Sequence, residues 1–257
     1  MKIGLLGYGR MGRMVEQAAQ ARGHLVVLRV DPQGEDGAVG AATAPTDLTA
    51  RLRAEAPDVL IDFTTADAVL PNLDAALAAQ VPLVVGTTGW SDHLEEARTR
   101  VQKAGGALLH GSNFSIGANL FARIVRNAGR LFDRFADYDP YVLEYHHRLK
   151  VDAPSGTAET LARSLLETLG RKRRLQVGNP EGRIAEDALQ VSSVRAGHAF
   201  GLHEVGFDGE VDRITLMHEA KSRMGFAQGA VFAAEWIQGR SGVFSIEDAL
   251  FGESDDA

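Results

Sequence analysis

The sequence contains no cysteine among its 257 residues. This absence excludes disulfide bonds, thiolate metal sites and cysteine nucleophiles, and it suits a reducing compartment. The sequence also lacks any window of roughly 18 consecutive apolar residues, the length that a membrane helix needs, and its first residues carry no cleavage signal. We therefore expect a cytoplasmic protein without a membrane partner.

An excess of positive charge is missing as well. Lysine and arginine total 27 against 34 aspartates and glutamates, which gives a formal net charge of -7. A surface that binds nucleic acid needs the opposite balance, so we expect no nucleic-acid partner. One basic run, Arg171 to Arg174, follows a helical pattern. We interpret it as a solvated loop at a helix C-terminus; the alternative is that it attracts an anionic substrate.

The chain is longer than one compact core usually is, so we expect two domains. In the first half, short strands that are apolar almost throughout alternate with amphipathic helices, which is typical of a doubly wound parallel sheet. The expected strands cover residues 3–6, 25–30, 59–63, 83–85 and 107–109. The expected helices cover residues 11–21, 47–55, 66–79 and 92–103, the last opened by a capping signal in which Ser91 or Asp92 precedes Glu95.

The pattern changes after residue 115. A long helix is expected over 118–135, a strand over 141–145, a helix over 157–169, and then strands over 189–194, 201–207 and 211–218. These strands alternate in polarity as those of a half-exposed antiparallel or mixed sheet do. The helix expected over 223–236 and the segment 244–251 return the chain to the first domain. The predicted domains are therefore 1–115 with 223–257, and 116–222.

A glycine-rich turn joins the first expected strand to the first expected helix. It reads Gly7-Tyr8-Gly9-Arg10-Met11-Gly12 and fits G-x-G-x-x-G, the fingerprint of a Rossmann-type dinucleotide-binding domain. Asp31 ends the second strand, where a carboxylate can accept hydrogen bonds from an adenosine ribose. The alternative is a plain turn with an incidental aspartate. Because a carboxylate repels the 2′-phosphate of NADPH and Pro32 adds no positive charge, we favour NADH; Arg10 offers partial compensation, so NADPH stays open.

Two further loops leave the carboxyl ends of expected strands, the edge at which doubly wound sheets bind ligands. They are Gly86-Thr87-Thr88-Gly89 and Gly111-Ser112-Asn113-Phe114. Both are predicted to hold the nicotinamide ribose and carboxamide, the alternative being ordinary polar turns. For Asp62, which also ends a strand, we expect a role in turn structure.

The densest group of chemically active side chains lies between residues 144 and 158. His146 and Lys150 are four apart, which would place them on one face of a strand or a helix. Ser155, Gly156 and Thr157 open a helix whose first amides form an anion site suited to a substrate carboxylate. An imidazole can donate a proton near neutral pH, and a neighbouring lysine can hold a carboxylate. The group suits reduction of an anionic substrate; the alternative is a basic surface stretch before a helix cap.

The stretch from His146 to Ala158, HHRLKVDAPSGTA, resembles the signature of the 4-hydroxy-tetrahydrodipicolinate reductase family. The resemblance extends over nearly the whole chain, through the glycine-rich turn with Arg13, Ile61-Asp62-Phe63-Thr64, Gly86-Thr87-Thr88-Gly89, Asn113-Phe114-Ser115, Arg195-Ala196-Gly197 and Ser222-Arg223-Met224. It implies an NAD(P)H-dependent oxidoreductase of diaminopimelate and lysine biosynthesis. The implied fold is α/β: a Rossmann-type doubly wound parallel sheet plus an α+β substrate and oligomerisation domain with a mixed or antiparallel sheet.

The resemblance also implies roles for individual residues. His146 would be the proton donor and Lys150 the second catalytic group, while His147, Ser155, Gly156 and Thr157 would bind the substrate's carboxylates. The implied cofactor contacts are Gly7, Tyr8, Gly9, Arg10, Met11, Gly12, Asp31, Gly86, Thr87, Thr88, Gly111, Ser112, Asn113 and Phe114. The resemblance further implies a homotetramer assembled through the sheet of the second domain.

The chain departs from the family pattern in places that affect the choice of cofactor. Its glycine-rich turn is one residue shorter than in many members, and Pro32 stands where some members carry an arginine for the 2′-phosphate. Two other functions stay open: another nicotinamide dehydrogenase of the same architecture, such as one acting on aspartate, and a non-catalytic NADH-sensing module. No pair of histidines has the spacing of a zinc-binding helix, so we expect no metal.

Overall fold

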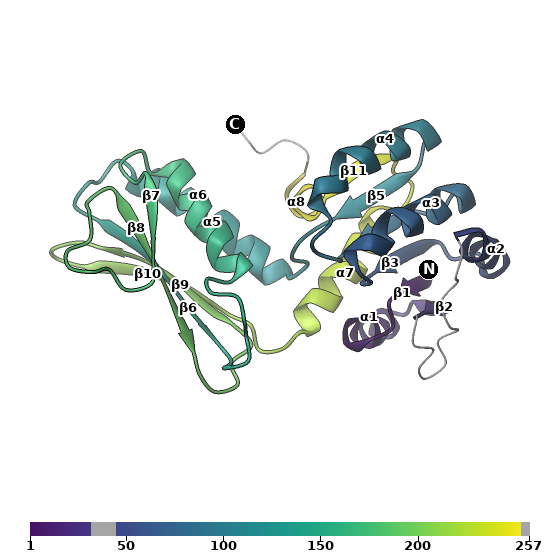
Figure 1. Ribbon diagram of the computed structural model, residues 1–257, viewed down its shortest axis with the longest axis horizontal. Coiled ribbons are helices and arrows are strands. Elements are labelled where there is room, and N and C mark those ends of the chain that lie inside the picture. The colour runs from purple at the N-terminus through teal and green to yellow at the C-terminus, as the bar shows by residue number, and fades with distance from the viewer. Residues whose placement is uncertain (32–44, 253–257) are drawn as a thin grey trace. The chain divides into compact units, whose positions relative to one another are not determined.

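A computed structural model describes residues 1–31 and 45–252 of the chain. They form two compact units, the first comprising Met1–Ile116 together with the segment that begins at Met224, and the second comprising Gly117–Arg223 (Figure 1). Pro32, to which the sequence analysis gave weight, lies outside the described residues. No helix in the described part of the chain is long and apolar enough to cross a membrane.

Unit 1 is built on a sheet in which every neighbouring pair of strands is parallel. The strand order is β11-β5-β4-β3-β1-β2. The strands are β1 (Lys2–Leu6), β2 (Leu25–Val30), β3 (Val59–Asp62), β4 (Leu83–Val85), β5 (Ala107–His110) and β11 (Gly242–Ser245). The expected doubly wound sheet is confirmed, and β11, which the sequence pattern did not indicate, joins its edge.

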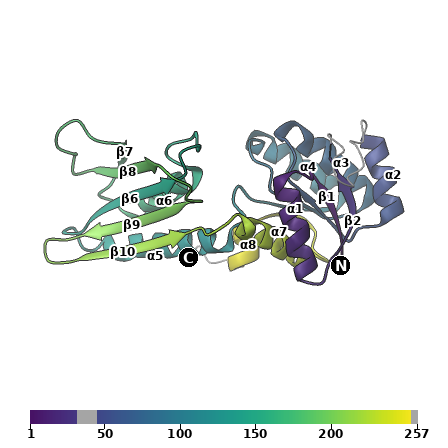
Figure 2. The same cartoon turned by 90° about the horizontal axis from the view of Figure 1, so that it is seen from below.

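Helices cover both faces of this sheet. They are α1 (Arg10–Ala21), α2 (Pro45–Glu55), α3 (Val69–Ala79), α4 (Leu94–Ala104), α7 (Met224–Trp236) and α8 (Ile246–Phe251), with 3₁₀ turns at Ala66–Ala68 and Ser91–His93. On one face α1 and α7 pack side by side (Figure 2) and bury Ile3, Leu5 and Ile61. On the other face α2, α3 and α4 bury Leu6 and Leu60. Alternate residues of one strand thus enter two cores, which explains why these strands are apolar almost throughout.

The capping signal expected before the fourth helix is wrong. Residues Ser91–His93 form a 3₁₀ turn, and His93 precedes the α-helix without a side-chain cap hydrogen bond. The segment expected as one helix over 66–79 likewise begins with a 3₁₀ turn. In both places the chain tightens before the α-helix starts, which a capping pattern in the sequence does not reveal.

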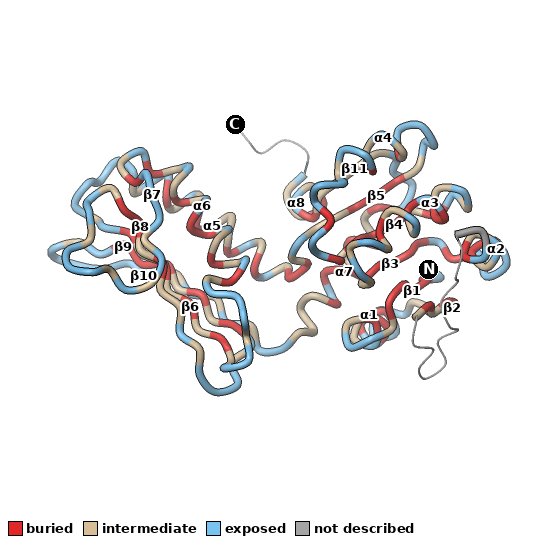
Figure 3. The backbone as a smooth tube through the Cα atoms, in the orientation of Figure 1, coloured by how far each residue is buried: buried red, intermediate tan, exposed pale blue. Residues whose placement is uncertain are grey.

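Unit 2 contains a mixed sheet of strand order β10-β9-β6-β8-β7 (Figure 2). The strands are β6 (Asp139–His146), β7 (Arg174–Val177), β8 (Ala188–Arg195), β9 (Leu202–Asp208) and β10 (Arg213–Glu219). β8 runs parallel to β6 and β7, whereas β9 runs antiparallel to β6 and β10. Helices α5 (Ile116–Phe132) and α6 (Gly156–Thr168) bury Val142, Val191, Val205 and Phe207 against one face, where the tube of Figure 3 is red.

The solvated-loop interpretation of the basic run is wrong at Lys172 and Arg174. Lys172 is 4% exposed, and its ammonium donates to the carbonyls of Glu186 at 2.7 Å and Ala188 at 2.9 Å and pairs with Asp139 at 2.5 Å. Arg174 begins β7, a strand that the sequence analysis missed. Within this run, Lys172 therefore stabilises the fold, because two carbonyl groups and one carboxylate compensate its buried charge.

Candidate active site

The loops predicted to bind the cofactor all follow carboxyl ends of strands in unit 1. Hydrogen bonds continue the ladder beyond the strands: Gly7 donates to Val30 at 2.8 Å, Gly86 to Asp62 at 2.9 Å and Gly111 to Val85 at 3.2 Å. Since parallel strands end at the same edge, these bonds bring the three loops to one edge of the sheet. The structure therefore gathers segments that are far apart in the sequence.

The three glycines of the turn meet different surroundings. Gly7 has φ +84°, and a Cβ there would lie 2.4 Å from the carbonyl oxygen of Phe63. A Cβ on Gly12 would lie 2.2 Å from the carbonyl oxygen of Gly7, whereas a Cβ on Gly9 would meet no atom of the described residues within 4 Å. Gly7 and Gly12 thus allow the turn to close, and Gly9 keeps open the approach to the first turn of α1.

The N-terminus of α1 fits a pyrophosphate. Gly9 is the N-cap residue, its position offers no side-chain cap hydrogen bond, and the described first turn carries no acidic residue. Amides at a helix N-terminus bind anions, and a carboxylate in the first turn would compete for them. Arg10 is exposed and Met11 is half-buried in this turn. These residues therefore fit the phosphates of a dinucleotide.

Asp31 lies directly against the glycine-rich turn. Its Oδ2 accepts a hydrogen bond of 2.7 Å from the backbone amide of Tyr8. The structure thus brings together the two features that the sequence linked by spacing alone. The Tyr8 phenol is engaged elsewhere, since it donates to the carboxylate of Glu16, which also pairs with Arg29.

A cavity of about 350 Å³ opens at the ends of β4 and β5. Its lining includes Thr87, Thr88, Gly111 and Ser112, all predicted cofactor residues, together with Gly89, Trp90, Ser91, Leu94, His110 and Glu247. Thr87 is buried and donates to Asp62 at 3.0 Å, so its hydroxyl is already used within the fold. Asp62 also accepts from Thr64 and Asn72, and burial raises the pKa of its carboxyl while these hydrogen bonds oppose the shift.

The side chains of the last two predicted cofactor residues, Asn113 and Phe114, contact other groups of the protein. Asn113 Oδ1 accepts from the backbone amide of Ser115 at 2.8 Å and so closes a local turn. Phe114 is 2% exposed, and its ring meets that of Phe63 edge-on with centroids 6.2 Å apart. Any contact of Phe114 with a cofactor would therefore come from its backbone.

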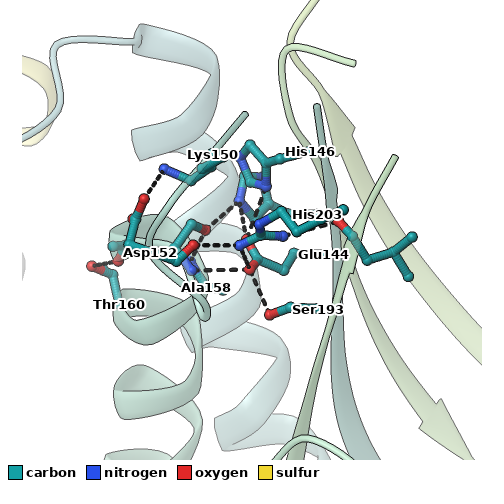
Figure 4. A network of polar contacts seen from close by, with 12 residues as sticks. Glu144, His146, Lys150, Asp152, Ala158, Thr160, Ser193 and His203 are labelled. Atoms are coloured by element: carbon teal, nitrogen blue, oxygen red, sulfur yellow. Dashed lines mark hydrogen bonds and ion pairs between the residues drawn. The ribbon is translucent and has the colours of Figure 1, made fainter. Parts of the chain in front are cut away.

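In unit 2, the helix-covered face of the sheet turns from apolar to polar toward the end of β6. Val142, Glu144 and His146 are alternate residues of β6, so all three lie on this face, and all three are buried. The strand register places Ser193 and His203 beside Glu144, and Arg195 beside His146. Three neighbouring strands thus contribute one polar cluster beneath the helices (Figure 4).

Glu144 is the centre of this cluster. Its Oε1 accepts from Ser193 Oγ at 2.6 Å, from Arg195 at 2.6 Å and from the backbone amide of Ser155 at 3.0 Å. Its Oε2 faces His146 Nδ1 at 3.0 Å and His203 Nε2 at 3.8 Å. Although burial favours the neutral acid, these donors outweigh it and hold the pKa of Glu144 far below its usual range.

His203 is a neutral member of the cluster. Burial, assisted by the nearby His146, lowers its pKa to about 4, although the Glu144 carboxylate opposes the shift. Its Nε2 lies 3.2 Å from Ser155 Oγ, and its ring meets that of His146 edge-on at 5.1 Å. Near neutral pH His203 therefore fills the space beside His146 without adding charge.

Lys150 does not share a strand or helix face with His146, so that expectation is wrong. β6 ends at His146, and the chain turns so that the Lys150 amide donates to the carbonyl of His147 at 3.1 Å. The Lys150 ammonium pairs with Asp152 at 2.8 Å. His147 is half-buried, and its amide donates to the carbonyl of Ala199 at 2.9 Å.

The expected helix start at the PSGT sequence is present. Ser155 is the N-cap of α6, and its Oγ accepts from the amide of Ala158 at 3.2 Å. Because the amide of Ser155 donates to Glu144, Ser155 is engaged within the protein through both groups. Gly156 is exposed and a Cβ there would meet no atom within 4 Å, which leaves room over the first turn of the helix. Thr157 follows it, half-buried.

Glu144, His146 and His203 each offer one atom that could bind a metal ion, and these three atoms lie within 4.8 Å of one another. However, the guanidinium of Arg195 already lies 2.6 Å from the Glu144 carboxylate. A cation inserted beside it would be repelled and would have to break the contact between Glu144 and His146. The geometry suits proton handling better than metal binding.

Family models match both halves of the chain. Residues 1–114 match the model of the dihydrodipicolinate reductase N-terminus, and residues 117–250 match that of its C-terminus. The chain belongs to the dihydrodipicolinate reductase family. The expectation of a nicotinamide-dependent reductase of this family is thereby confirmed.

Individual dihydrodipicolinate reductases agree with this assignment. A 4-hydroxy-tetrahydrodipicolinate reductase of Christiangramia forsetii is 34% identical over 97% of this chain and 98% of its own. That of Methanoculleus marisnigri is 41% identical over 79% of each chain. A dipicolinate-bound dihydrodipicolinate reductase from Paenisporosarcina sp. TG-14 has a TM-score of 0.77 at 22% identity, covering 95% of this chain and 97% of its own, and shows that the fold is shared.

No role was assigned from the sequence to Glu144, Ser193 or His203. Glu144 and His146 are two apart in an expected strand, so both belong on one face. Glu144 stands at a position of that strand where the alternation predicts a buried apolar residue. A buried carboxylate needs partners, so this acidic residue was the signal in the sequence that could have indicated the polar cluster. Arg195 appeared in the family resemblance, but its contact with Glu144 depends on strand pairing that the sequence does not reveal.

Proposed function

We propose that this chain reduces 4-hydroxy-tetrahydrodipicolinate to tetrahydrodipicolinate, with loss of water, in diaminopimelate and lysine biosynthesis. The balanced reaction consumes the substrate, one NAD(P)H and one proton and releases NAD(P)⁺ and water. The observation that supports it best is the buried contact of Glu144 with His146 beside the first turn of α6. The relatives' names and the dipicolinate bound to the Paenisporosarcina protein point to the same class of substrate, a six-membered nitrogen ring that carries two carboxylates.

The proposed roles follow from charge and position. His146 donates the proton that accompanies reduction, because an imidazole can act as an acid near neutral pH and its ring is placed beside Glu144, with Nδ1 3.0 Å from the carboxylate. His147, Ser155, Gly156 and Thr157 form the carboxylate site; Gly156 and Thr157 offer first-turn positions, and the N-cap Ser155 fixes the start of the helix. Lys150 is the second catalytic group and attracts the anionic substrate from its turn, where Asp152 holds its ammonium.

A nicotinamide bound to unit 1 supplies the hydride. We propose that Gly7, Tyr8, Gly9, Arg10, Met11 and Gly12 hold its pyrophosphate and that Asp31 accepts from the ribose. The residues of the other two loops, Gly86 to Thr88 and Gly111 to Phe114, hold the nicotinamide end. NADH is favoured over NADPH because the carboxylate of Asp31, fixed against the turn by Tyr8, would repel a 2′-phosphate.

We also propose a cytoplasmic homotetramer assembled through the sheet of unit 2. Helices cover one face of this sheet, and Leu143, Tyr145, Val194, Leu202 and Met217 lie on the other. Val194 is 45% exposed and Met217 60% exposed. Ser192, Glu204 and Glu219 share this face. Its exposed apolar side chains make it a candidate for burial against another copy.

The test is oxidation of NADH, or separately of NADPH, followed at 340 nm with substrate generated from pyruvate and aspartate semialdehyde. Oxidation that requires the complete substrate mixture supports the proposal and ranks the cofactors. Oxidation with aspartate-type substrates instead would indicate another dehydrogenase of this architecture. NADH binding without turnover on either would indicate a sensing module.

A further inference from the structure

Two buried polar atoms in unit 2 face each other, and neither makes a hydrogen bond of standard geometry within the described part of the chain. They are Glu144 Oε2 and His146 Nδ1, which lie 3.0 Å apart. Glu144 is 0% exposed and His146 is 6% exposed. Since neither atom can turn to solvent, each needs a hydrogen-bond partner within the protein, and the other atom of the pair lies at hydrogen-bond distance.

The chemistry of this pair fixes where the ring carries its proton. An ionised carboxylate only accepts hydrogen bonds, so His146 Nδ1 must carry a hydrogen whether the ring is neutral or charged. The labile proton is then the one on Nε2. That nitrogen lies beside Gly201, where a Cβ would approach it to 2.8 Å. A glycine at this position leaves Nε2 uncovered.

We propose that Glu144 is a positioning residue that holds His146 in the Nδ1–H tautomer, so that Nε2 delivers the proton. This inference rests on the proposed function of His146 as the proton donor. Glu144 also accepts from the amide of Ser155, so one carboxylate orients both the proton donor and the first turn of α6. A ring that turned away from Glu144 would leave a buried charge without one of its partners.

The groups around the pair come from each element packed against it. On β8, Arg195 bonds Glu144 Oε1 and the carbonyl of Asp152. On β9, His203 lies 3.8 Å from Glu144 Oε2, and His218 of β10 stacks on His203 with ring centroids 6.5 Å apart. In the loop after β6, Lys150 and Asp152 form their own ion pair. Arg195 offsets the charge of Glu144 through Oε1 and leaves Oε2 to His146.

The substitution Glu144→Gln tests this arrangement because it keeps the shape and removes the charge. The amide oxygen would stay with Arg195 and the Ser155 amide, which only donate, so the NH₂ group would face His146 Nδ1. We expect kcat to fall about 100-fold with KM changed less than threefold, because proton donation is lost and binding is not. The pH–kcat profile should also differ from that of wild type, because a carboxylate would no longer hold the ring that delivers the proton.

Glu204→Gln is the matched control. Glu204 lies on β9 of the same sheet, faces the opposite side and accepts from the phenol of Tyr141 at 2.6 Å. It should keep the wild-type kcat and pH profile. A kcat and pH profile for Glu144→Gln equal to those of Glu204→Gln would overturn the proposal, as would an increase in KM alone.

A second measurement uses the wild-type protein and so does not depend on whether the variant folds. Long-range ¹H–¹⁵N spectra of protein labelled at histidine, with His146 assigned from His146→Gln, report which ring nitrogen carries the hydrogen. We expect the Nδ1–H tautomer at a pH at which the ring is neutral. The Nε2–H tautomer would overturn the proposal even if Glu144→Gln is inactive. Wild-type protein that does not oxidise NADH or NADPH with the complete substrate mixture would instead refute the proposed function.

Discussion

The backbone amide of Ser155 donates to Glu144 Oε1 over 3.0 Å, and this bond ties the first turn of α6 to the central strand of its sheet. In the proposed reaction, a proton must be delivered to a molecule held by its carboxylates. Because one carboxylate side chain contacts both His146 and the helix start, the proton donor and the anion site keep a fixed separation within unit 2. Such fixed geometry is what general acid catalysis requires.

Removing either proposed catalytic group should affect turnover and leave cofactor binding intact. We expect His146→Gln and Lys150→Met each to lower kcat by about 100-fold or more, since a positioned acid contributes about that much. The dissociation constant for NADH, measured by fluorescence titration, should change less than twofold. His93→Gln and Lys103→Met, on exposed positions of unit 1, are the controls. Loss of NADH binding in the first pair would show that the two residues belong to another site.

The acidic residue beside the glycine-rich turn should decide between the two cofactors. Asp31→Ala should weaken NADH binding about tenfold or more, as expected for a charge-assisted hydrogen bond, and weaken NADPH binding less. Asp58→Ala is a matched control, because Asp58 also accepts from a backbone amide next to β1, that of Lys2 at 2.6 Å. An unchanged ratio of the two dissociation constants in Asp31→Ala would remove the carboxylate from the ribose contact.

Substitution by alanine should have different effects at two glycines of the same turn. Gly12→Ala places a Cβ 2.2 Å from the carbonyl oxygen of Gly7 and should destabilise the protein by roughly 1–3 kcal/mol, an overpacking effect. Gly9→Ala meets no atom within 4 Å in the part of the chain that the structure describes, so it should leave the melting temperature nearly unchanged while it weakens NADH binding. Thermal melts with and without NADH separate the two effects. Equal melting temperatures for the two variants would contradict this account of the turn.

The sequence predicted the parallel sheet well because β1, β3, β4 and β5 are buried on both faces and therefore carry continuous apolar runs. It also located His146 and the start of α6, since a histidine signature and a helix cap are local features. It did not predict the contact of Glu144 with Arg195, because strand pairing brings them together from 51 positions apart. It wrongly placed Lys150 on one face with His146, because the residue at which a strand ends depends on where the neighbouring strands end. It missed β11, a short edge strand whose partner, β5, lies more than a hundred residues earlier.

The neutral histidine of the polar cluster should make stability depend on pH. The pKa of His203 in the folded protein is about 4, below the roughly 6.5 of an unfolded chain. Between these values the unfolded state binds more protons, so the stability contributed by neutral His203 is complete above pH 6.5 and is lost as pH falls toward 4. The loss should reach about 3 kcal/mol over the full window.

Urea unfolding at pH 7.5 and pH 5 measures this effect. His203→Gln should show a smaller drop in the free energy of unfolding than wild type; a drop remains because burial also lowers the pKa of His218. His198→Gln, at an exposed position of the same unit, should behave as wild type. A wild-type free energy of unfolding that is the same at both pH values would contradict the burial of a neutral ring.

The uncovered face of the second sheet should be an assembly surface. Val194 is a residue of β8, and the strand register pairs it with Tyr145 of β6 on this face. A lysine there would place a charge among apolar side chains that a neighbouring copy would bury, and such a charge is costly without a partner. We expect wild type to sediment as a tetramer and Val194→Lys to sediment as smaller species. Val211→Lys is the control, because Val211 is 90% exposed in the turn between β9 and β10. If Val194→Lys and Val211→Lys sediment alike as tetramers, the subunits must associate through another surface, since a buried apolar face would not accept the charge.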